Sequence, residues 1–265
     1  MNHNRNIFLA IGFILTTTLA CGSLTAPTTP TAMPTSTNMP PTATSVPLYQ
    51  QVTVSTISFN DSGKSPDYTI TAQIPALEGN SDPRAAAFTT AMHDLVQGLI
   101  DDFKKNLAQN PVTPVKAASY LDIKFSVVSP PGNILSVKYL VEGYLAGMAH
   151  PYHLNPTFNF DLESGKELSL ADLFLPNVDY LTPISKYCVA ELTRRDIGFT
   201  SDFAQGADPK PENYKNWNIT VDGLVITFDE YQVAPYVAGP QAVTIPYTEL
   251  KGLIDPNGAL AQFIK

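Results

Sequence analysis

The chain has 265 residues, of which 16 are Lys or Arg and 24 are Asp or Glu, so its formal net charge is −8 at pH 7. This acidic balance argues against a nucleic-acid partner, because proteins that bind nucleic acid neutralise phosphates with basic side chains. Hydrophobic residues make up 44% of the chain, enough for one sizeable core or for two small, closely packed subdomains.

The first 21 residues are typical of a bacterial lipoprotein signal. Arg5 is the only charged residue before Asp61, and Ile7 to Leu19 form an apolar run that is short for a membrane span. The run leads into Ala20-Cys21, where a small residue before a cysteine resembles a lipobox. We expect cleavage before Cys21, its diacylation, and a lipid anchor on the extracytoplasmic face of the cell membrane. A plain secretory signal and an uncleaved single-pass anchor are the alternatives.

Residues 22–48 are predicted to be a disordered tether. The stretch from Ser23 to Pro47 is rich in Thr, Pro, Ala and Ser, has no charged residue and shows no apolar periodicity, so it cannot bury a core. Its prolines favour extended polyproline II, which rises roughly 3 Å per residue. Such a spacer would hold a domain tens of ångströms from the membrane, unless it is filler without a role.

Two strands and a long helix are predicted next. Val52 to Val54 and the alternation from Tyr68 to Ile74 predict a hairpin across the turn-rich residues 61–66. From Pro83 to Leu107 the apolar period lengthens to that of a helix. The predicted stripe of this helix consists of Phe88, Met92, Leu95, Leu99 and Phe103.

More strands follow. Alternating residues at 121–127 and 135–141 predict an antiparallel pair across Pro130 to Asn133, and residues 158–162 predict another strand. Ser169 and Asp172 have the spacing of a capping box that opens a short helix.

A helix beginning at Thr182-Pro183 would place Ile184, Cys188 and Leu192 on one face. Acylation of Cys21 would leave Cys188 as the only other cysteine, so no intramolecular disulfide is expected. We interpret Cys188 as a buried small hydrophobe, with a nucleophilic thiol as the alternative.

The last predicted elements are a hairpin, a strand and a helical turn. Residues 217–221 and 224–228 flank Asp222-Gly223, a type I′ turn signal, and 243–245 and 248–253 follow as strand and helix. We therefore predict an α+β fold with a largely antiparallel sheet, one long helix and two or three shorter helices. The predicted halves are an N-terminal α+β half at 49–135 and a C-terminal half at 136–265.

The search for chemical motifs finds no Gly-rich phosphate loop, His-Glu-x-x-His helix, Gly-x-Ser-x-Gly elbow or Cys-x-x-Cys pair, and predicts no cofactor. His150 and His153 are concentrated in a Pro-interrupted loop after a strand. Two imidazoles supply too few ligands for a metal site, so a structural turn is favoured. An envelope hydrolase or metal-dependent enzyme centred on His150 and His153 is the alternative.

Two sequence blocks carry a family resemblance. The first is Gly147 to Pro151 with Phe158 to Leu168 and Leu173-Phe174; the second is Phe228 to Pro240 with residues 243–247 and 249–250. In order and spacing they resemble the extracytoplasmic domain family shared by the lysozyme-sensing anti-sigma factor RsiV and the non-catalytic N-terminal part of the peptidoglycan deacetylase PdaC. Residues 50–130 match that family only in element order.

The resemblance implies a non-enzymatic binding or sensing module for a muramidase-like protein, such as a lysozyme, or for cell-wall glycan. We expect the shared outer module alone, without the sensor's sigma-binding segment or the deacetylase domain. Loss of Arg5 with the signal would bring the charge to −9, which favours a basic protein partner. A purely structural lipoprotein is the third hypothesis.

If a protein binds, four tyrosines are the predicted aromatic anchors, with two histidines on the same loops: Tyr144, Tyr152, Tyr231 and Tyr236, with His150 and His153. Tyr231 and Tyr236 have a rival role, which is to fix the Gln232 to Pro240 loop against the sheet.

Overall fold

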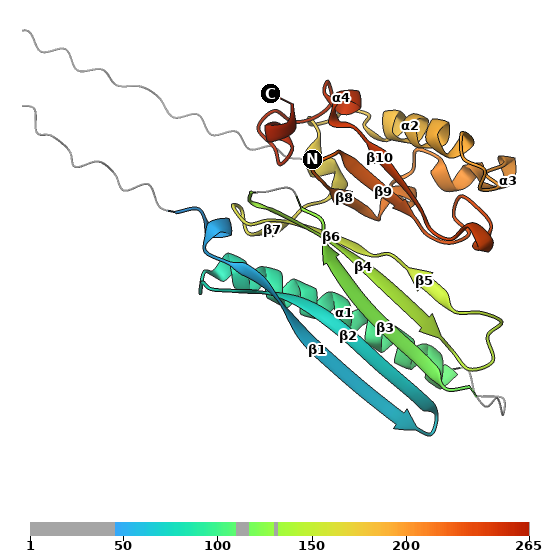
Figure 1. Ribbon diagram of the computed structural model, residues 1–265. Helices are drawn as coiled ribbons and strands as arrows, with labels where there is room; N and C mark the ends of the chain where they lie inside the picture. The colour runs from blue at the N-terminus through green and yellow to red at the C-terminus, as the bar shows by residue number, and fades with distance from the viewer. Residues whose placement is uncertain (1–45, 110–116, 130–131, 265) are drawn as a thin grey trace, which may run out of the picture. The chain divides into compact units, whose positions relative to one another are not determined.

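The computed structural model describes residues 46–109, 117–129 and 132–264 (Figure 1). The predicted signal with Cys21, and the predicted tether up to residue 45, lie outside the described residues. Ser45–Lys265 is one compact unit. It opens with a short 3-10 turn, η1 (Leu48–Gln50), in which Leu48 is buried, so ordered structure begins before the predicted end of the tether. No helix in the described ranges is long and apolar enough to cross a membrane.

A seven-stranded sheet forms the larger part of this unit (Figure 1). Its strand order is β1-β2-β3-β4-β6-β7, with β5 paired beside β4. All pairs are antiparallel except β2 and β3, which are parallel and are connected through the long helix α1. The predicted α+β class with a largely antiparallel sheet is confirmed. The bounds are β1 Thr53–Lys64, β2 Asp67–Glu78, α1 Pro83–Gln109, β3 Ser119–Val127, β4 Ile134–Tyr144, β5 Tyr152–Leu154, β6 Thr157–Asp161 and β7 Lys166–Glu167.

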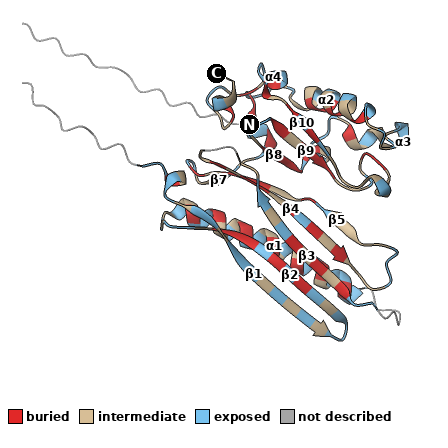
Figure 2. Ribbon diagram, in the orientation of Figure 1, coloured by how far each residue is buried: buried red, intermediate tan, exposed pale blue. Residues whose placement is uncertain are grey.

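Helix α1 packs on one face of this sheet, and both α1 and the strands carry buried residues (Figure 2). Its buried stripe follows the helical period but is centred slightly differently from the prediction, because Val96 and Ile100 are buried while Leu95 and Leu99 only flank it. Alternate residues of the strands complete this cluster, so the α1 face is apolar. The buried stripe consists of Phe88, Met92, Val96, Ile100, Phe103 and Leu107.

A second hydrophobic cluster lies around a three-stranded antiparallel sheet with order β10-β9-β8. Ile184, Cys188 and Leu192 of α2 are fully buried in it, as predicted. Burial raises the pKa of Cys188 to about 12, so the thiol is a packing group and is not activated as a nucleophile. The bounds are α2 Leu181–Thr193, α3 Ser201–Ala204, β8 Trp217–Ile219, β9 Leu224–Phe228, β10 Gln241–Ile245 and α4 Tyr247–Leu250. The further 3-10 turns are η2 Leu170–Leu173, η3 Gln205–Ala207, η4 Pro211–Tyr214, η5 Tyr236–Ala238 and η6 Ala261–Phe263.

Several predicted boundaries are confirmed and others are wrong. Ser169 and Asp172 do form a capping box, at η2. The first hairpin is tighter than expected, because pairing continues to Lys64 opposite Asp67. The type I′ turn is absent from the described β8–β9 connection, because Asp222 lacks the positive φ that this turn requires and Val221 is 66% exposed outside the strand. The last predicted helix, at residues 248–253, is shorter in the structure, where α4 ends at Leu250.

A buried polar network connects the two sheets. The Ser136 hydroxyl donates to Asn159 Oδ1 at 2.6 Å and accepts hydrogen bonds from Asn218 Nδ2 at 2.9 Å and from the Ile219 backbone N–H at 3.0 Å. These contacts use all three positions of that hydroxyl and join β4, β6 and β8. The predicted boundary between residues 135 and 136 falls within β4, whose Ile134 packs in the second cluster while Val137, Tyr139 and Val141 pack in the first.

The face of the large sheet opposite α1 is covered by β8 only near the start of β4. Beyond Ser136, the same side of β4 carries Lys138, Leu140 and Glu142, none of which is fully buried. We call this side of β2, β3, β4 and β5 the open face. The loop after β9 lies against one end of it, which is where the predicted site residues gather.

Candidate functional site

Strand β5 lies where a loop was expected. It pairs antiparallel with β4, so that His153 is opposite Glu142 and Tyr152 is opposite Gly143. Residues directly opposite each other in such a pair point to the same side of the sheet, and neighbours along a strand point to opposite sides. His153 is therefore on the open face, while Tyr152 is on the α1 face.

Two observations support this position of Tyr152. A Cβ atom at Gly143 would collide with the Tyr152 ring, so the ring covers the α1 side of that glycine. Burial raises the pKa of Tyr152, and Asp102 of α1 contributes to the same effect. The structure thus separates Tyr152 from the other predicted anchors, since its ring is directed toward the helix.

His153 lies between two carboxylates. Its Nδ1 is 2.6 Å from Glu230 Oε1, and its backbone N–H donates to Glu230 Oε2 at 3.2 Å. Its Nε2 is 3.9 Å from Glu142 Oε2. The side chain of Glu230 is only 9% exposed, and both of its carboxylate oxygens contact His153.

The chain of contacts continues to Tyr120, whose hydroxyl donates to Glu142 Oε1 at 2.6 Å. This hydrogen bond raises the pKa of Tyr120 to about 12. Sequence reasoning named neither Tyr120 nor Glu230 as a site residue. Glu230 lies inside the second family block, beside Tyr231, and this position could have marked it as a candidate site residue.

The remaining predicted anchors meet at the loop after β9. The rings of His150 and Tyr236 stack with centroids 3.9 Å apart, and the Tyr231 ring is 5.6 Å from Tyr236. The Tyr236 hydroxyl donates to the Pro151 carbonyl at 3.0 Å, and the Tyr231 hydroxyl lies 3.4 Å from His150 Nε2. Tyr236 therefore does fix this loop against the β5 segment, while its ring also forms part of the surface.

Tyr144, at the end of β4, stacks on Tyr120 with ring centroids 6.0 Å apart. Tyr236 acts on the pKa of Tyr120 as well, which places the two aromatic groups within electrostatic reach of each other. We call this set of side chains the aromatic surface. It consists of Tyr120, Tyr144, His150, His153, Tyr231 and Tyr236, which includes five of the six predicted residues.

A groove of about 530 Å³ borders the aromatic surface. Leu140, His153 and Glu230 line it on the sheet side, and the loop from Tyr236 to Pro240 lines the other side. Val237 on that loop is 93% exposed. The apolar side chain of Val237 lies beside aromatic rings and the carboxylates of Glu142 and Glu230. This combination is suited to binding a partner that offers both apolar and cationic groups.

The same geometry orients His153 for general-base chemistry, since Glu230 holds its Nδ1. No Ser, Thr or Cys side chain within the described ranges hydrogen-bonds to this imidazole. Among the residues that the structure describes, no group of three or more His, Cys, Asp or Glu side chains could hold a metal ion.

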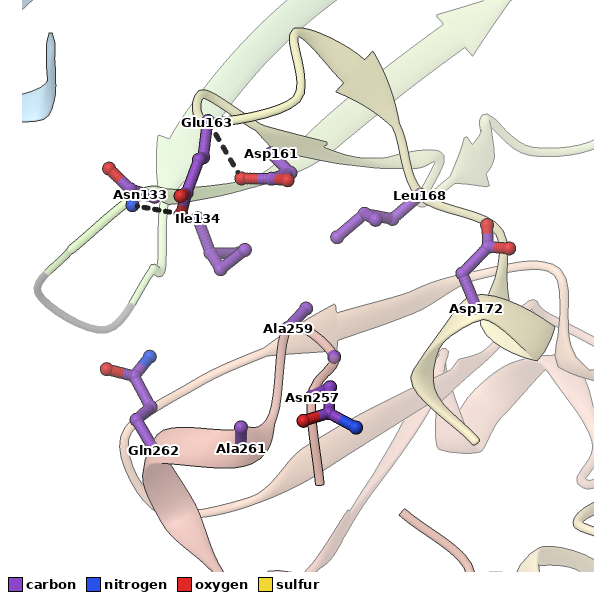
Figure 3. Close-up of a pocket in the computed structure, with 11 residues that line it drawn as sticks. Asn133, Ile134, Asp161, Glu163, Leu168, Asp172, Asn257, Ala259, Ala261 and Gln262 are labelled. Carbon is purple, nitrogen blue, oxygen red and sulfur yellow. Dashed lines mark hydrogen bonds between the residues drawn. The ribbon is translucent and has the colours of Figure 1, made fainter. Parts of the chain in front are cut away.

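Another cavity, of about 440 Å³, lies between the β6–β7 turn and the C-terminal segment (Figure 3). Figure 3 shows Asp161 and Glu163 on one wall with Asn133. The carboxylate of Asp161 accepts the backbone N–H groups of Glu163 and Ser164, and Glu163 accepts from Asn133 Nδ2 at 3.0 Å. Because these acceptors are engaged in turn formation, we interpret this cavity as structural.

Residues 171–248 match the family model described as a protein of unknown function, DUF3298. The chain is 29% identical over 136 residues to peptidoglycan-N-acetylmuramic acid deacetylase PdaC of Bacillus subtilis (strain 168), covering 51% of this chain and 29% of the relative. It is 27% identical over 107 residues to esterase Rv3036c of Mycobacterium tuberculosis (strain ATCC 25618 / H37Rv), covering 40% of this chain and 47% of the relative. The matched part thus spans less than half of each curated relative.

A solved structure of a DUF3298 family member from Bacteroides fragilis shares the fold, with a TM-score of 0.61 and 15% identity, over 81% of this chain and 97% of that one. Similarity to the anti-sigma factor RsiV stays a prediction. The predicted resemblance to this domain family is confirmed: residues 171–248 match the DUF3298 model, and the similarity to PdaC and the shared fold agree with that match.

Proposed function

We propose that this chain is a non-enzymatic binding module of the cell envelope, which captures a basic, muramidase-like protein such as a lysozyme. The observation that carries the proposal is the aromatic surface with its groove, beside Glu142, Glu230 and the exposed Val237. Tyrosine is enriched among the side chains that dominate protein interfaces, and it orders at low entropic cost. The carboxylates would attract a cationic partner and increase its association rate.

The cellular location is also part of the proposal. The name of PdaC describes an enzyme that acts on peptidoglycan, which is consistent with a cell-envelope setting for this chain. We infer that acylated Cys21 anchors the mature protein on the extracytoplasmic face of the membrane, and that residues 22–45 act as the spacer. Radiolabelled fatty acid incorporation that is lost on Cys21→Ala substitution would support the anchor, and incorporation that persists would overturn it.

Binding of the proposed partner is tested by titrating the full chain with a c-type lysozyme at low and at physiological salt. Contacts driven by charge alone are screened over roughly 8 Å at physiological ionic strength. We therefore expect binding to persist at physiological salt if the interface is shaped. No binding, or binding only at low salt, would overturn the protein partner.

A matched pair of exposed valines maps the interface. Val237→Arg should weaken lysozyme binding at least tenfold, because it places a cation and a bulky side chain on the wall of the groove beside the aromatic surface. Val221, 66% exposed on the β8–β9 connection, provides the control, since Val221→Arg makes the same charge change away from the aromatic surface. Equal effects of the two variants would contradict the assignment of this surface.

Two other functions are each favoured by specific observations. The name of PdaC favours cell-wall glycan as the ligand, and sedimentation with purified peptidoglycan tests it. The contact between His153 and Glu230, with the match to an esterase, favours a hydrolase. Hydrolysis of a short-chain nitrophenyl ester that disappears in His153→Gln would replace the binding proposal by the enzymatic one.

A further inference from the structure

A second concavity lies on the open face, next to the groove already described. Its volume is about 540 Å³, and Leu140 lines both concavities. The walls come from β2, β3 and β4 and from Asn155, in the segment that connects β5 to β6. None of the predicted anchor residues lines it.

Asn155 is buried in the wall without a partner for its amide. The residue is 3% exposed, and its Nδ2 has no hydrogen-bond partner among the described residues. The next residue, Pro156, accepts a hydrogen bond from the Tyr139 backbone N–H at 2.9 Å, which holds this segment against β4. Leaving a buried donor unpaired is destabilising, so an acceptor from a ligand would be favourable here.

Lys138 is the second donor without an acceptor. It lies on β4 on the same side as Leu140, and no carboxylate of the described residues is within 4 Å of its ammonium group. Burial lowers the pKa of Lys138, and no acidic neighbour offsets that effect. Lys124 lines the same concavity but is paired with Asp122.

The two unpaired donors define the chemistry of a ligand. It must offer an anionic acceptor to the Lys138 ammonium group and an oxygen acceptor to the Asn155 amide. The side chain of Leu140 is 49% exposed and offers an apolar contact at the rim. Recognition of an anionic oxygen acceptor follows from these donors alone.

We propose that this concavity binds a carboxylate-bearing amino sugar of the N-acetylmuramic acid type, with Lys138 holding the carboxylate and Asn155 donating to a carbonyl oxygen. Such a sugar carries a lactyl carboxylate and an acetamido carbonyl on one ring. The choice of a saccharide rests on the proposed cell-envelope function. The site is distinct from the aromatic surface, so one chain could contact a muramic acid residue whose lactyl carboxylate is free of a stem peptide and a protein at the same time.

The test compares three probes on the full chain by isothermal titration calorimetry: N-acetylmuramic acid, N-acetylglucosamine and acetate. N-acetylglucosamine lacks the lactyl carboxylate, and acetate lacks the sugar. We expect N-acetylmuramic acid to bind at least tenfold more tightly than either of the others. Equal affinity for the two sugars would overturn carboxylate recognition, and equal affinity for acetate would overturn the saccharide.

Two lysine variants provide a matched comparison. Lys138→Gln should remove the preference for N-acetylmuramic acid, while Lys124→Gln, in the same concavity but paired with Asp122, should keep it within twofold. Retention of the preference in Lys138→Gln, or no binding by the unaltered chain, would overturn the proposal. Lysozyme titration tests Val237 and this experiment tests Lys138, so a failure of either proposal can be told from a failure of the other.

Discussion

The two faces of the seven-stranded sheet serve different purposes. On the α1 face, Phe88 packs edge-on against the rings of Phe158 and Phe160 with centroids 6.2 and 5.6 Å away, and all three are buried. On the open face, charged and aromatic side chains contact one another but remain partly in solvent. The fold depends on the first face, which leaves the second free to carry a site.

Adjacent residues of one strand lie on opposite faces and therefore differ in burial and in contacts. Tyr139 is fully buried, with its hydroxyl 3.3 Å from the Met92 sulfur, whereas Leu140 is at the rim of both concavities. Tyr152 is directed to α1, and the adjacent His153 contacts Glu230. A substitution in β4 or β5 therefore affects mainly stability or mainly binding, according to the side of the strand on which the residue lies.

The largest expected effect is on the α1 face. Phe88→Ala should lower the free energy of unfolding by about 3–5 kcal/mol, because it removes a buried ring and leaves a cavity. Leu140→Ala on the open face should cost under about 1 kcal/mol, since half of that side chain is already in solvent. Urea unfolding followed by circular dichroism measures both, and equal losses would erase the distinction between the faces.

Two tyrosines provide a sharper contrast, because both are half-buried but lie on opposite faces. Tyr152→Ala should cost about 2 kcal/mol of stability and leave lysozyme affinity unchanged. Tyr144→Ala should cost under about 1 kcal/mol and weaken lysozyme binding several-fold, since its ring stacks on Tyr120 in the aromatic surface. Thermal unfolding and calorimetric titration of each variant decide the matter; a binding defect in Tyr152→Ala alone would reverse the assignment.

The smallest effect concerns two tyrosines whose pKa is raised for different reasons. The pKa of Tyr120 is raised to about 12 mainly by its hydrogen bond to Glu142, and that of Tyr139 is raised by burial. Because the folded-state pKa of Tyr120 exceeds its unfolded value, its contribution to stability is complete below pH 10 and is lost as pH rises toward 12.

Glu142→Gln removes the carboxylate and should therefore return the Tyr120 pKa toward 10 without moving that of Tyr139. Ultraviolet difference titration, with Tyr120→Phe subtracted to isolate this group, measures the change. An unchanged titration curve in Glu142→Gln would show that the hydrogen bond is not what raises the pKa of Tyr120.

Local patterns in the sequence predicted much of the fold. The helical period of α1, the capping box of η2 and the buried position of Cys188 each depend on residues close together in the chain. The parallel pairing of β2 with β3 and the short β5 could not be predicted, because both require partners far along the chain or a run too short to show a period.

The candidate site was also predicted only in part, because some of its contacts join residues that are far apart in the chain. The family blocks contain His150, Tyr231 and Tyr236, the loop after the strand also offered His153, and the structure brings these four residues together. The sequence could not show that Glu230, 77 positions from His153, is its partner, since the contact is made only when the two sheets are in place. The unpaired amide of Asn155 has no sequence signal at all.

The Ser136 hydroxyl controls the alignment of the two sheets. Since it has one proton and two lone pairs, all committed to Asn159, Asn218 and Ile219, a slip of β8 by one residue would strand several buried polar groups at once. The loop that brings Glu230 and Tyr236 to β5 follows β9, which is hydrogen-bonded to β8. A buried hydroxyl thus helps to fix the position of β8 and β9, and with them the loop that lines the groove. Replacing Ser136 would displace this loop although Ser136 does not line the groove.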